Sequence, residues 1–264
     1  MGIVNVTPDS FSGDGLAYDP QRAVAQGLAM VEAGADLLDV GGESTRPGAL
    51  PVAPQEEAAR IVPVIRELAS RVAVPVSADT SKPEVMAQAL DAGAALINDV
   101  TALGGPSGRE AAGMLAARKT PLVLMHMQNT PVTMQRAPTY QDVVGEVYGF
   151  LADRIDFCRR AGMDGDRLLV DTGIGFGKST AHNLTLLRRQ RAFHGLGTPL
   201  LLGVSRKRVV GALTGESEPR PRDQASHLLA TLTGATMVRV HDVAGARRAM
   251  AVASGLGQAD LEAA

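Results

Sequence analysis

Short apolar runs recur along the chain, and their hydrophobicity is nearly continuous instead of alternating. Such runs are typical of parallel β-strands that are buried on both faces. The runs are Gly2–Val6, Asp36–Val40, Val76–Ala78, Ala95–Ile97, Leu122–Met125, Leu168–Val170, Leu200–Val204 and Met237–Val240. The pattern therefore predicts eight strands in a parallel sheet.

Stretches with helical spacing of apolar residues separate these runs. Pro54 opens one of them, and Gly34 and Gly93 follow the ends of two others, as expected at helix starts and ends. The helices are predicted over Gln21–Ala33, Gln55–Ala69, Val85–Ala92, Asp142–Arg160, Lys207–Leu213, Asp223–Thr233 and Ala244–Leu256.

The alternation of strands and helices predicts an α/β protein, a single (β/α)₈ TIM barrel whose eight strands are parallel. Such a barrel typically takes about 250 residues. The chain has 264 residues and no linker divides it, so residues 1–264 are predicted to form one domain. An open doubly wound sheet is the structural alternative.

Polar residues gather where each apolar run ends, whereas the loops that enter the runs are short and plain. Examples are Gly41–Pro47 after the second run, Asp79–Lys82 after the third and Ser205–Lys207 after the seventh. In parallel barrels the C-terminal face carries the active site and the opposite face carries stability. We therefore expect one active site at the C-terminal strand ends.

Three of these strand ends carry a carboxylate or an amide: Asp79, Asn98 and Asp171. A carboxylate accepts a pair of parallel hydrogen bonds from a flat N–C–N unit, such as the amino-pyrimidinone edge of a pterin or a guanine. The alternative is that each residue caps the helix that follows. Three such residues on one rim favour the binding of a flat heterocycle.

Cationic side chains gather at the same strand ends. Arg239 and His241 are two residues apart on one strand and project to the same face. With Lys207 and Arg46 they form a positive group that suits phosphate or pyrophosphate. Asn5 could add a neutral oxygen to a magnesium ion, which needs few protein ligands when phosphate oxygens are present.

Composition and charge exclude several function classes. A formal net charge of −2 provides no basic surface for nucleic acid or membrane lipid. No apolar run approaches the roughly 18 residues of a membrane span, and no secretory signal is evident, so we expect a cytoplasmic protein. Gly175–Ser179 ends like a phosphate-binding P-loop, but Thr172 stands where that motif needs its first glycine.

In chain order, the polar segments resemble the signatures of the dihydropteroate synthase family. Asn5–Ser12 and Asp39–Gly48 are similar to its two long signatures. Six shorter segments follow in the family's order, namely Asp79–Pro83, Ile97–Asp99, Leu124–Gln128, Gly175–Lys178, Ser205–Lys207 and Arg239–Asp242. The resemblance extends from Met1 to about Val252.

This resemblance implies a pterin-binding transferase of folate biosynthesis. In the reaction, 6-hydroxymethyl-7,8-dihydropterin pyrophosphate loses pyrophosphate and the amine of p-aminobenzoate takes its place, which gives 7,8-dihydropteroate. The family also implies Mg²⁺ as cofactor, sulfonamides as competing ligands and a homodimer. Neither nucleic acid nor membrane is an expected partner.

The resemblance also assigns the site residues. The residues expected to hold the pterin are Asp79, Asn98, Asp171 and Lys207. Those expected around the pyrophosphate are Asn5, Arg239 and His241, with Asn5 also a ligand of the metal. Those expected around p-aminobenzoate are Phe11, Thr45, Arg46, Pro47 and Ser205. We expect Lys207, Arg239 and His241 to act in catalysis.

Two departures from the family pattern and two alternatives bear on this interpretation. Gly13–Asp14 replaces the usual acid–glycine order in the first loop, and Thr172 replaces a proline after Asp171. One alternative is a pterin-binding methyltransferase barrel, which would not need Thr45–Pro47 or Ser205–Lys207. The other is a pterin-binding protein that does not catalyse a reaction.

Overall fold

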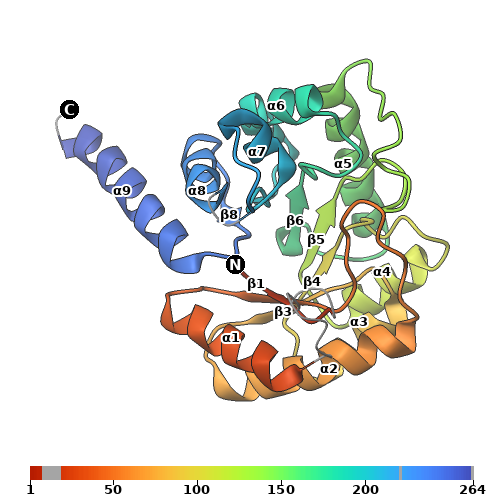
Figure 1. The fold of residues 1–264 in the computed structure, drawn as a ribbon. Helices are drawn as coiled ribbons and strands as arrows, with labels where there is room; N and C mark the ends of the chain where they lie inside the picture. Colours follow the sequence, from red (N-terminus) through yellow and green to blue (C-terminus); the bar gives the residue numbers. More distant parts are fainter. Residues whose placement is uncertain (8–18, 220–221, 263–264) are drawn as a thin grey trace.

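The structure is a computed structural model, and it describes residues 1–7, 19–219 and 222–262. Strands and helices alternate along these residues (Figure 1). The strands are β1 (Gly2–Asn5), β2 (Leu38–Gly41), β3 (Val76–Asp79), β4 (Leu96–Asp99), β5 (Leu122–Met125), β6 (Leu168–Asp171), β7 (Leu200–Leu202) and β8 (Met237–Val238). The α-helices are α1 (Pro20–Glu32), α2 (Pro54–Arg71), α3 (Pro83–Asp91), α4 (Gly108–Ala117), α5 (Val143–Arg160), α6 (Thr180–Arg188), α7 (Arg208–Thr214), α8 (Arg222–Leu232) and α9 (Val243–Glu262), and the 3₁₀ helices are η2 (Gly165–Arg167) and η3 (Gln190–Leu196).

Within the described residues, the strands form one eight-stranded sheet in the order β1 to β8. All neighbouring strands are parallel. The predicted α/β class with eight parallel strands is therefore confirmed. A doubly wound sheet would reverse its strand order at a switch point, so the sequential order excludes that alternative.

The last strand is shorter than the run Met237–Val240 that the sequence predicts. Beyond β8, the Arg239 N–H still donates to Leu202 O at 2.9 Å. Val240 then bonds with the start of the chain, because its N–H donates to Met1 O and its carbonyl accepts from Ile3 N–H, both at 3.0 Å. The end of the predicted run therefore lies beside β1.

The helices lie outside the curved sheet, and α9 extends away from it (Figure 1). Their starts follow from local sequence. Asp19 caps α1 by accepting the backbone N–H groups of Gln21 and Arg22, and Ser179 caps α6 with a capping box. Within the described residues, no helix is both long and apolar enough to cross a membrane.

The strand register brings polar residues to one end of the sheet. Gly41 pairs with Asp79, and Asp79 pairs with Asn98. Two strands away from Asn98, Asp171 pairs with Met125. Every residue of β2, β4 and β5 is buried, as expected for strands with side chains packed on both faces. The carboxyl ends of the strands therefore share one polar rim above an apolar core.

Two glycines allow a test of how backbone conformation contributes to stability. Gly93 ends α3 with φ of 107°, and an added Cβ would lie 2.9 Å from that of Ala69. We expect Gly93→Ala to lower the free energy of unfolding by about 1–2 kcal/mol. Gly113 is a matched control inside α4 with open space around it, where alanine should raise stability by about 0.5–1 kcal/mol. Urea denaturation measures both, and equal effects would contradict the backbone argument.

Candidate active site

The Arg239 guanidinium lies between two carboxylates at the polar rim. Its Nε donates to Asp39 Oδ2 at 2.6 Å, and an Nη donates to Asp79 Oδ2 at 2.7 Å. The amide of Asn98 also donates to Asp39 Oδ2, at 3.0 Å. Asp39 is fully buried, so these donors replace the water that would otherwise solvate its charge. Arg239 thereby joins the end of β8 to β2 and β3.

The charges of this cluster depend on one another. Burial raises the pKa of Asp79, and Arg239 partly offsets that effect. Burial also disfavours the charged form of Arg239, but Asp39 and Asp79 outweigh it and raise the pKa of Arg239. Arg239 therefore stays cationic. A ligand that donates hydrogen bonds to Asp79 would stabilise its ionised form.

A second cluster is formed by Asp171 and Lys207. A Cβ added at Gly203 would lie 3.7 Å from Lys207 Nζ and 3.8 Å from Asp171 Oδ2, so both charged groups lie beside this glycine. Lys207 Nζ also donates to Ile174 O and lies 4.6 Å from the centroid of the Phe176 ring. Burial lowers the pKa of Lys207 to about 8, although Asp171 acts in the opposite direction. The arrangement pairs an acceptor and a donor beside an aromatic face.

His241 is connected to this rim through Ser205. The Ser205 hydroxyl lies 2.6 Å from Asp223 Oδ1 and 2.8 Å from His241 Nδ1. A carboxylate can only accept, so the hydroxyl donates to Asp223 and accepts from His241 Nδ1–H. Burial, followed by the charges of nearby cations, lowers the pKa of His241 to about 3. The imidazole is therefore neutral at pH 7, with a lone pair on Nε2.

The charge of His241 differs from the expectation that it joins the positive group. Arg206, Arg239, Arg46 and Lys207 all disfavour its protonated form, in addition to burial. The cations of the rim are therefore the arginines and Lys207, and His241 contributes a hydrogen-bonding nitrogen in the free protein.

The glycine-rich segment Gly173–Gly177 is held by a buried lysine. Lys178 Nζ lies 2.9 Å from His126 Nδ1 and donates to the carbonyl oxygens of Gly173 and Phe176, each at 3.0 Å. Gly173 has φ of 65°, and an added Cβ would lie 1.9 Å from His126 O, so only glycine fits there. The P-loop-like sequence thus uses its lysine to hold its own loop.

The remaining expected residues lie around the rim. Asn5 ends β1 opposite Gly41 of β2. Thr45, Arg46 and Pro47 lie in the loop between β2 and α2, where Arg46 and Pro47 are exposed. Phe11 falls outside the described residues, as does the departure at Gly13–Asp14. The strand ends therefore bring together Asp79, Asn98, Asp171, Ser205, Lys207, Arg239 and His241.

Comparison with known proteins identifies the family. The family model described as pterin binding enzyme matches residues 1–241. Dihydropteroate synthase of Escherichia coli (strain K12) is 46% identical over 254 residues, which cover 96% of this chain and 89% of that protein. The chain belongs to the dihydropteroate synthase family. The expectation of a transferase of folate biosynthesis is thereby confirmed at the level of the family.

Solved structures of dihydropteroate synthase family members agree with this fold. Xanthomonas albilineans dihydropteroate synthase with 4-aminobenzoic acid has a TM-score of 0.89, is 50% identical and matches 97% of this chain and 92% of its own. Yersinia pestis dihydropteroate synthase with a sulfonamide drug has a TM-score of 0.91 at 43% identity, over 97% of this chain and 93% of its own. Another Xanthomonas albilineans structure holds 7,8-dihydropteroate.

Three residues of this dihydropteroate synthase family site were missed by sequence reasoning. Asp39 carried a signal, because a charged residue stands inside an otherwise apolar run. Lys178 was included in a P-loop-like segment and in a family-like segment, but no role was assigned to it. Asp223 gave no local signal, because it meets Ser205 across 18 positions of sequence. All three fix neighbouring side chains or loops.

The protonation of His241 is directly testable. Its pKa of about 3 lies below the ordinary value of 6.5, so we expect no titration of its ring between pH 5 and 8 in the free protein. Between pH 3 and 6.5, His241 binds a proton in the unfolded chain but not in the folded protein. His241 therefore lowers the free energy of unfolding as pH falls from about 6.5 towards 3. Histidine ring NMR, assigned with His241→Asn, measures the titration. A titration midpoint of the His241 ring near pH 6.5 would contradict the prediction. Pyrophosphate should raise the pKa by offsetting the nearby cations.

Proposed function

We propose that this chain catalyses the condensation of 6-hydroxymethyl-7,8-dihydropterin pyrophosphate with p-aminobenzoate, which yields 7,8-dihydropteroate and pyrophosphate. The observation that carries the proposal is the rim itself. Asp171 provides an acceptor and Lys207 a donor beside Arg239, in a chain 46% identical to a dihydropteroate synthase. One end of this rim suits a flat heterocycle and the other suits an anion.

The pterin would lie at Asp79, Asn98, Asp171 and Lys207. Asp171 is buried at the end of β6, and burial raises its pKa while Lys207 holds it down. Its carboxylate would accept the paired N–H groups of the amino-pyrimidinone edge, and Lys207 would donate to a ring acceptor. Such paired contacts would place the methylene carbon and its leaving group toward the cations of the rim.

The pyrophosphate would lie at Asn5, Arg239 and His241. Negative charge grows on the leaving oxygen as its bond to the methylene carbon breaks, and Arg239 is a fixed cation that stabilises this charge. His241 Nε2 would take up a proton when the anion offsets the surrounding cations, and it would then donate to a phosphate oxygen. The amine of p-aminobenzoate forms the new bond to carbon and loses one proton.

We propose Mg²⁺ as the cofactor, held mainly by the substrate. Within the described residues, no group of three His, Cys, Asp or Glu side chains is arranged to hold a metal ion. A caged ion therefore does not fit, whereas Mg²⁺ needs few protein ligands when phosphate oxygens and water complete its shell. Asn5 would supply one neutral oxygen. When bound, Mg²⁺ would neutralise part of the charge on pyrophosphate.

The amine substrate would lie among Thr45, Arg46, Pro47, Ser205 and Phe11, with Lys207 at the boundary to the pterin. Arg46 suits a carboxylate, and a sulfonamide would compete at the same place. Because Ser205 is fixed by Asp223 and His241, it forms the rigid side of this pocket. A methyltransferase barrel would not need these residues, so their presence favours the synthase.

We propose further that residues 1–264 form one domain with a closed (β/α)₈ barrel. The support comes from the backbone bonds between Val240 and Met1 or Ile3, and from a parallel bridge between Gly2 and Val240. One core cluster also contains residues from Val4 in β1 to Ala246 in α9. Closure would surround the rim with strand ends on all sides.

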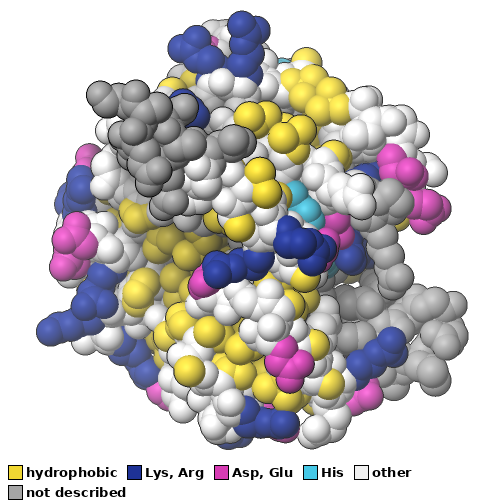
Figure 2. All heavy atoms as spheres, turned by 90° about the vertical axis from the view of Figure 1, so that its left-hand side faces the viewer, with side chains coloured by type: hydrophobic (Ala, Val, Ile, Leu, Met, Phe, Trp, Pro, Cys, Tyr) yellow, Lys and Arg dark blue, Asp and Glu magenta, His cyan; other side chains and the backbone are white. Residues whose placement is uncertain are grey.

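We also propose a homodimer through the outer face of α7, α8 and α9. Large apolar side chains are exposed there, and Figure 2 shows hydrophobic side chains on the side that carries α8 and α9. They are Leu213, Leu228, Leu232, Met250 and Val252. Sedimentation velocity of the wild type and of Leu228→Glu tests this interface, since a charge should weaken it.

The cytoplasm remains the proposed location.

The proposed reaction is tested by a coupled assay of pyrophosphate release. We expect release that requires p-aminobenzoate and Mg²⁺ and that is matched by an equal amount of 7,8-dihydropteroate. Release without the amine would indicate hydrolysis instead of transfer. Binding of the pterin without any product would favour the non-catalytic alternative, and methyl transfer from a folate would favour the methyltransferase.

Asp171→Asn tests the pterin site. The amide offers a donor where the heterocycle also donates, so we expect a loss of about 2–4 kcal/mol, or roughly 30-fold or more in pterin affinity. Titration calorimetry measures the affinity, and thermal unfolding shows that the variant is folded. Asp91→Asn is a matched control at an exposed acid on α3. An affinity for the pterin within severalfold of the wild type would remove Asp171 from the site.

A further inference from the structure

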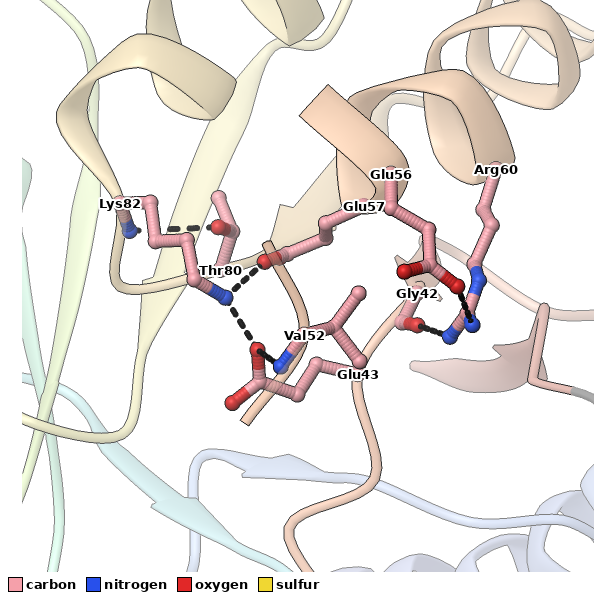
Figure 3. Close-up of polar contacts among 8 residues, drawn as sticks. All are labelled: Gly42, Glu43, Val52, Glu56, Glu57, Arg60, Thr80 and Lys82. Atoms are coloured by element: carbon pink, nitrogen blue, oxygen red, sulfur yellow. Dashed lines mark hydrogen bonds and ion pairs between the residues drawn. The ribbon is translucent and has the colours of Figure 1, made fainter. Parts of the chain in front are cut away.

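The loop between β2 and α2 must hold its shape if it is to bind the amine. It carries Thr45, Arg46 and Pro47, and most of its tip is exposed to solvent. Exposed backbone is costly to order because little burial offsets the lost conformational entropy. Polar side chains form a network of contacts at the base of this loop (Figure 3).

Glu43 ties the two ends of the loop together. Its carboxylate Oε2 accepts the backbone N–H of Val52 at 3.2 Å, nine positions along the chain. The segment 43–52 is thus a compact loop whose ends are close, as in an Ω-loop. We call the contact between Glu43 and Val52 the neck of the loop.

Lys82 joins this neck to the body of the protein. Its ammonium donates to Glu43 Oε2, at the neck, and to Glu57 Oε2, on α2. Figure 3 shows the three side chains meeting from three separate elements, with Lys82 in the turn before α3. The single cation therefore fixes the loop to α2 and to the strand end at β3.

The burial of these groups makes the lysine necessary. The Glu57 side chain is 1% exposed, Lys82 is 18% exposed and Glu43 is 21% exposed. Burial raises the pKa of Glu57, and the hydrogen bond from Lys82 acts against that rise. For Lys82, the two carboxylates outweigh burial and raise the pKa, so the ammonium stays charged. Without the cation, the buried carboxylate of Glu57 and the half-buried carboxylate of Glu43 would repel each other.

The other fixed points of the loop lie apart from this network. Arg60 of α2 donates to Gly42 O at 2.7 Å, which holds the residue before the neck. At the tip, Gly48 N–H donates to Pro131 O at 2.9 Å. The network of Glu43, Glu57 and Lys82 meets the loop at Glu43, between these two contacts in sequence.

We propose that Lys82 is a positioning residue for the amine substrate, which it serves by holding the neck of the β2–α2 loop in place. The proposal rests on the proposed function, because that function assigns Thr45, Arg46 and Pro47 to p-aminobenzoate. Lys82 acts on this substrate through Glu43 and does not itself belong to the pterin site.

The test is Lys82→Met, which keeps the length of the side chain and removes the charge. We expect the KM for p-aminobenzoate to rise about tenfold, equivalent to about 1.4 kcal/mol, with a smaller change in kcat. Affinity for the pterin pyrophosphate should stay within about twofold by calorimetry. Hydrogen exchange of the backbone of residues 43–52 should become faster in the free enzyme.

Matched variants separate positioning from a general loss of stability. Lys82→Arg can bridge two carboxylates and should restore the KM. Arg118→Met removes the exposed ion pair with Asp91 at 2.6 Å, and it should change neither the KM nor the exchange. Glu43→Gln keeps an acceptor for Val52 but loses the charge, so it should shift both measurements in the same direction as Lys82→Met. If Lys82→Met does not fold, Glu43→Gln is the test.

Two results would overturn the proposal. One is an unchanged KM with unchanged exchange in Lys82→Met, and the other is an equal loss of affinity for both substrates. If the wild type makes no 7,8-dihydropteroate, the proposed function fails by itself. Hydrogen exchange then decides the role of Lys82, since faster exchange at 43–52 supports the neck and unchanged exchange rejects it.

Discussion

A half-buried cation shared by two carboxylates is the interaction on which the rest of the site depends. If Arg239 left this position, the fully buried carboxylate of Asp39 would lose its cationic partner, which is energetically costly. The guanidinium is therefore fixed before any substrate arrives. Electrostatic stabilisation is most effective from groups that do not have to reorganise during the reaction. The aspartates would thus prepare Arg239 for the pyrophosphate of the proposed reaction.

The loops around the rim are held by buried or partly buried lysines. Lys178 holds the segment Gly173–Gly177 through carbonyl oxygens, and Lys82 holds the β2–α2 loop through carboxylates. One ammonium offers three donors and can satisfy several acceptors from different loops at once. In each loop the lysine acts together with other contacts, such as those from Gly175 N–H to Asn183 Oδ1 and from Arg60 to Gly42 O.

Much of the fold could be predicted from the sequence, because it rests on local pattern. Each strand overlaps a predicted apolar run, although β2, β3, β4 and β6 extend one or two residues beyond it, and Gly34 and Gly93 follow the ends of α1 and α3. The polar strand ends also indicated the rim, since parallel strands bring their carboxyl ends together. Asp79 and Asn98 are register partners for this reason.

The side-chain contacts of the site could not be predicted, because they join residues that are far apart in the sequence. No local pattern pairs Asp39 with Arg239, or Lys82 with Glu57. The neutral state of His241 is likewise a property of its surroundings, since burial and four cations set its pKa. Sequence reasoning counted it among the cations because it follows Arg239 by two residues on one strand and was expected to project to the same face. Charge at this rim is decided by contacts and not by residue type alone.

The contacts between the two ends of the sheet, and between residues far apart in sequence, have a consequence for how the molecule is made. Arg239 lies 200 positions from Asp39, and the Met1 ammonium bonds to Val238 O across 237 positions. Contacts between such distant residues form slowly, because a long intervening chain must be brought together first. During synthesis, β2 and β3 leave the ribosome long before Arg239, whose guanidinium neutralises the carboxylates of Asp39 and Asp79. Until then, Asp39 and Asp79 remain without their cation, and the nascent chain must keep these carboxylates in water.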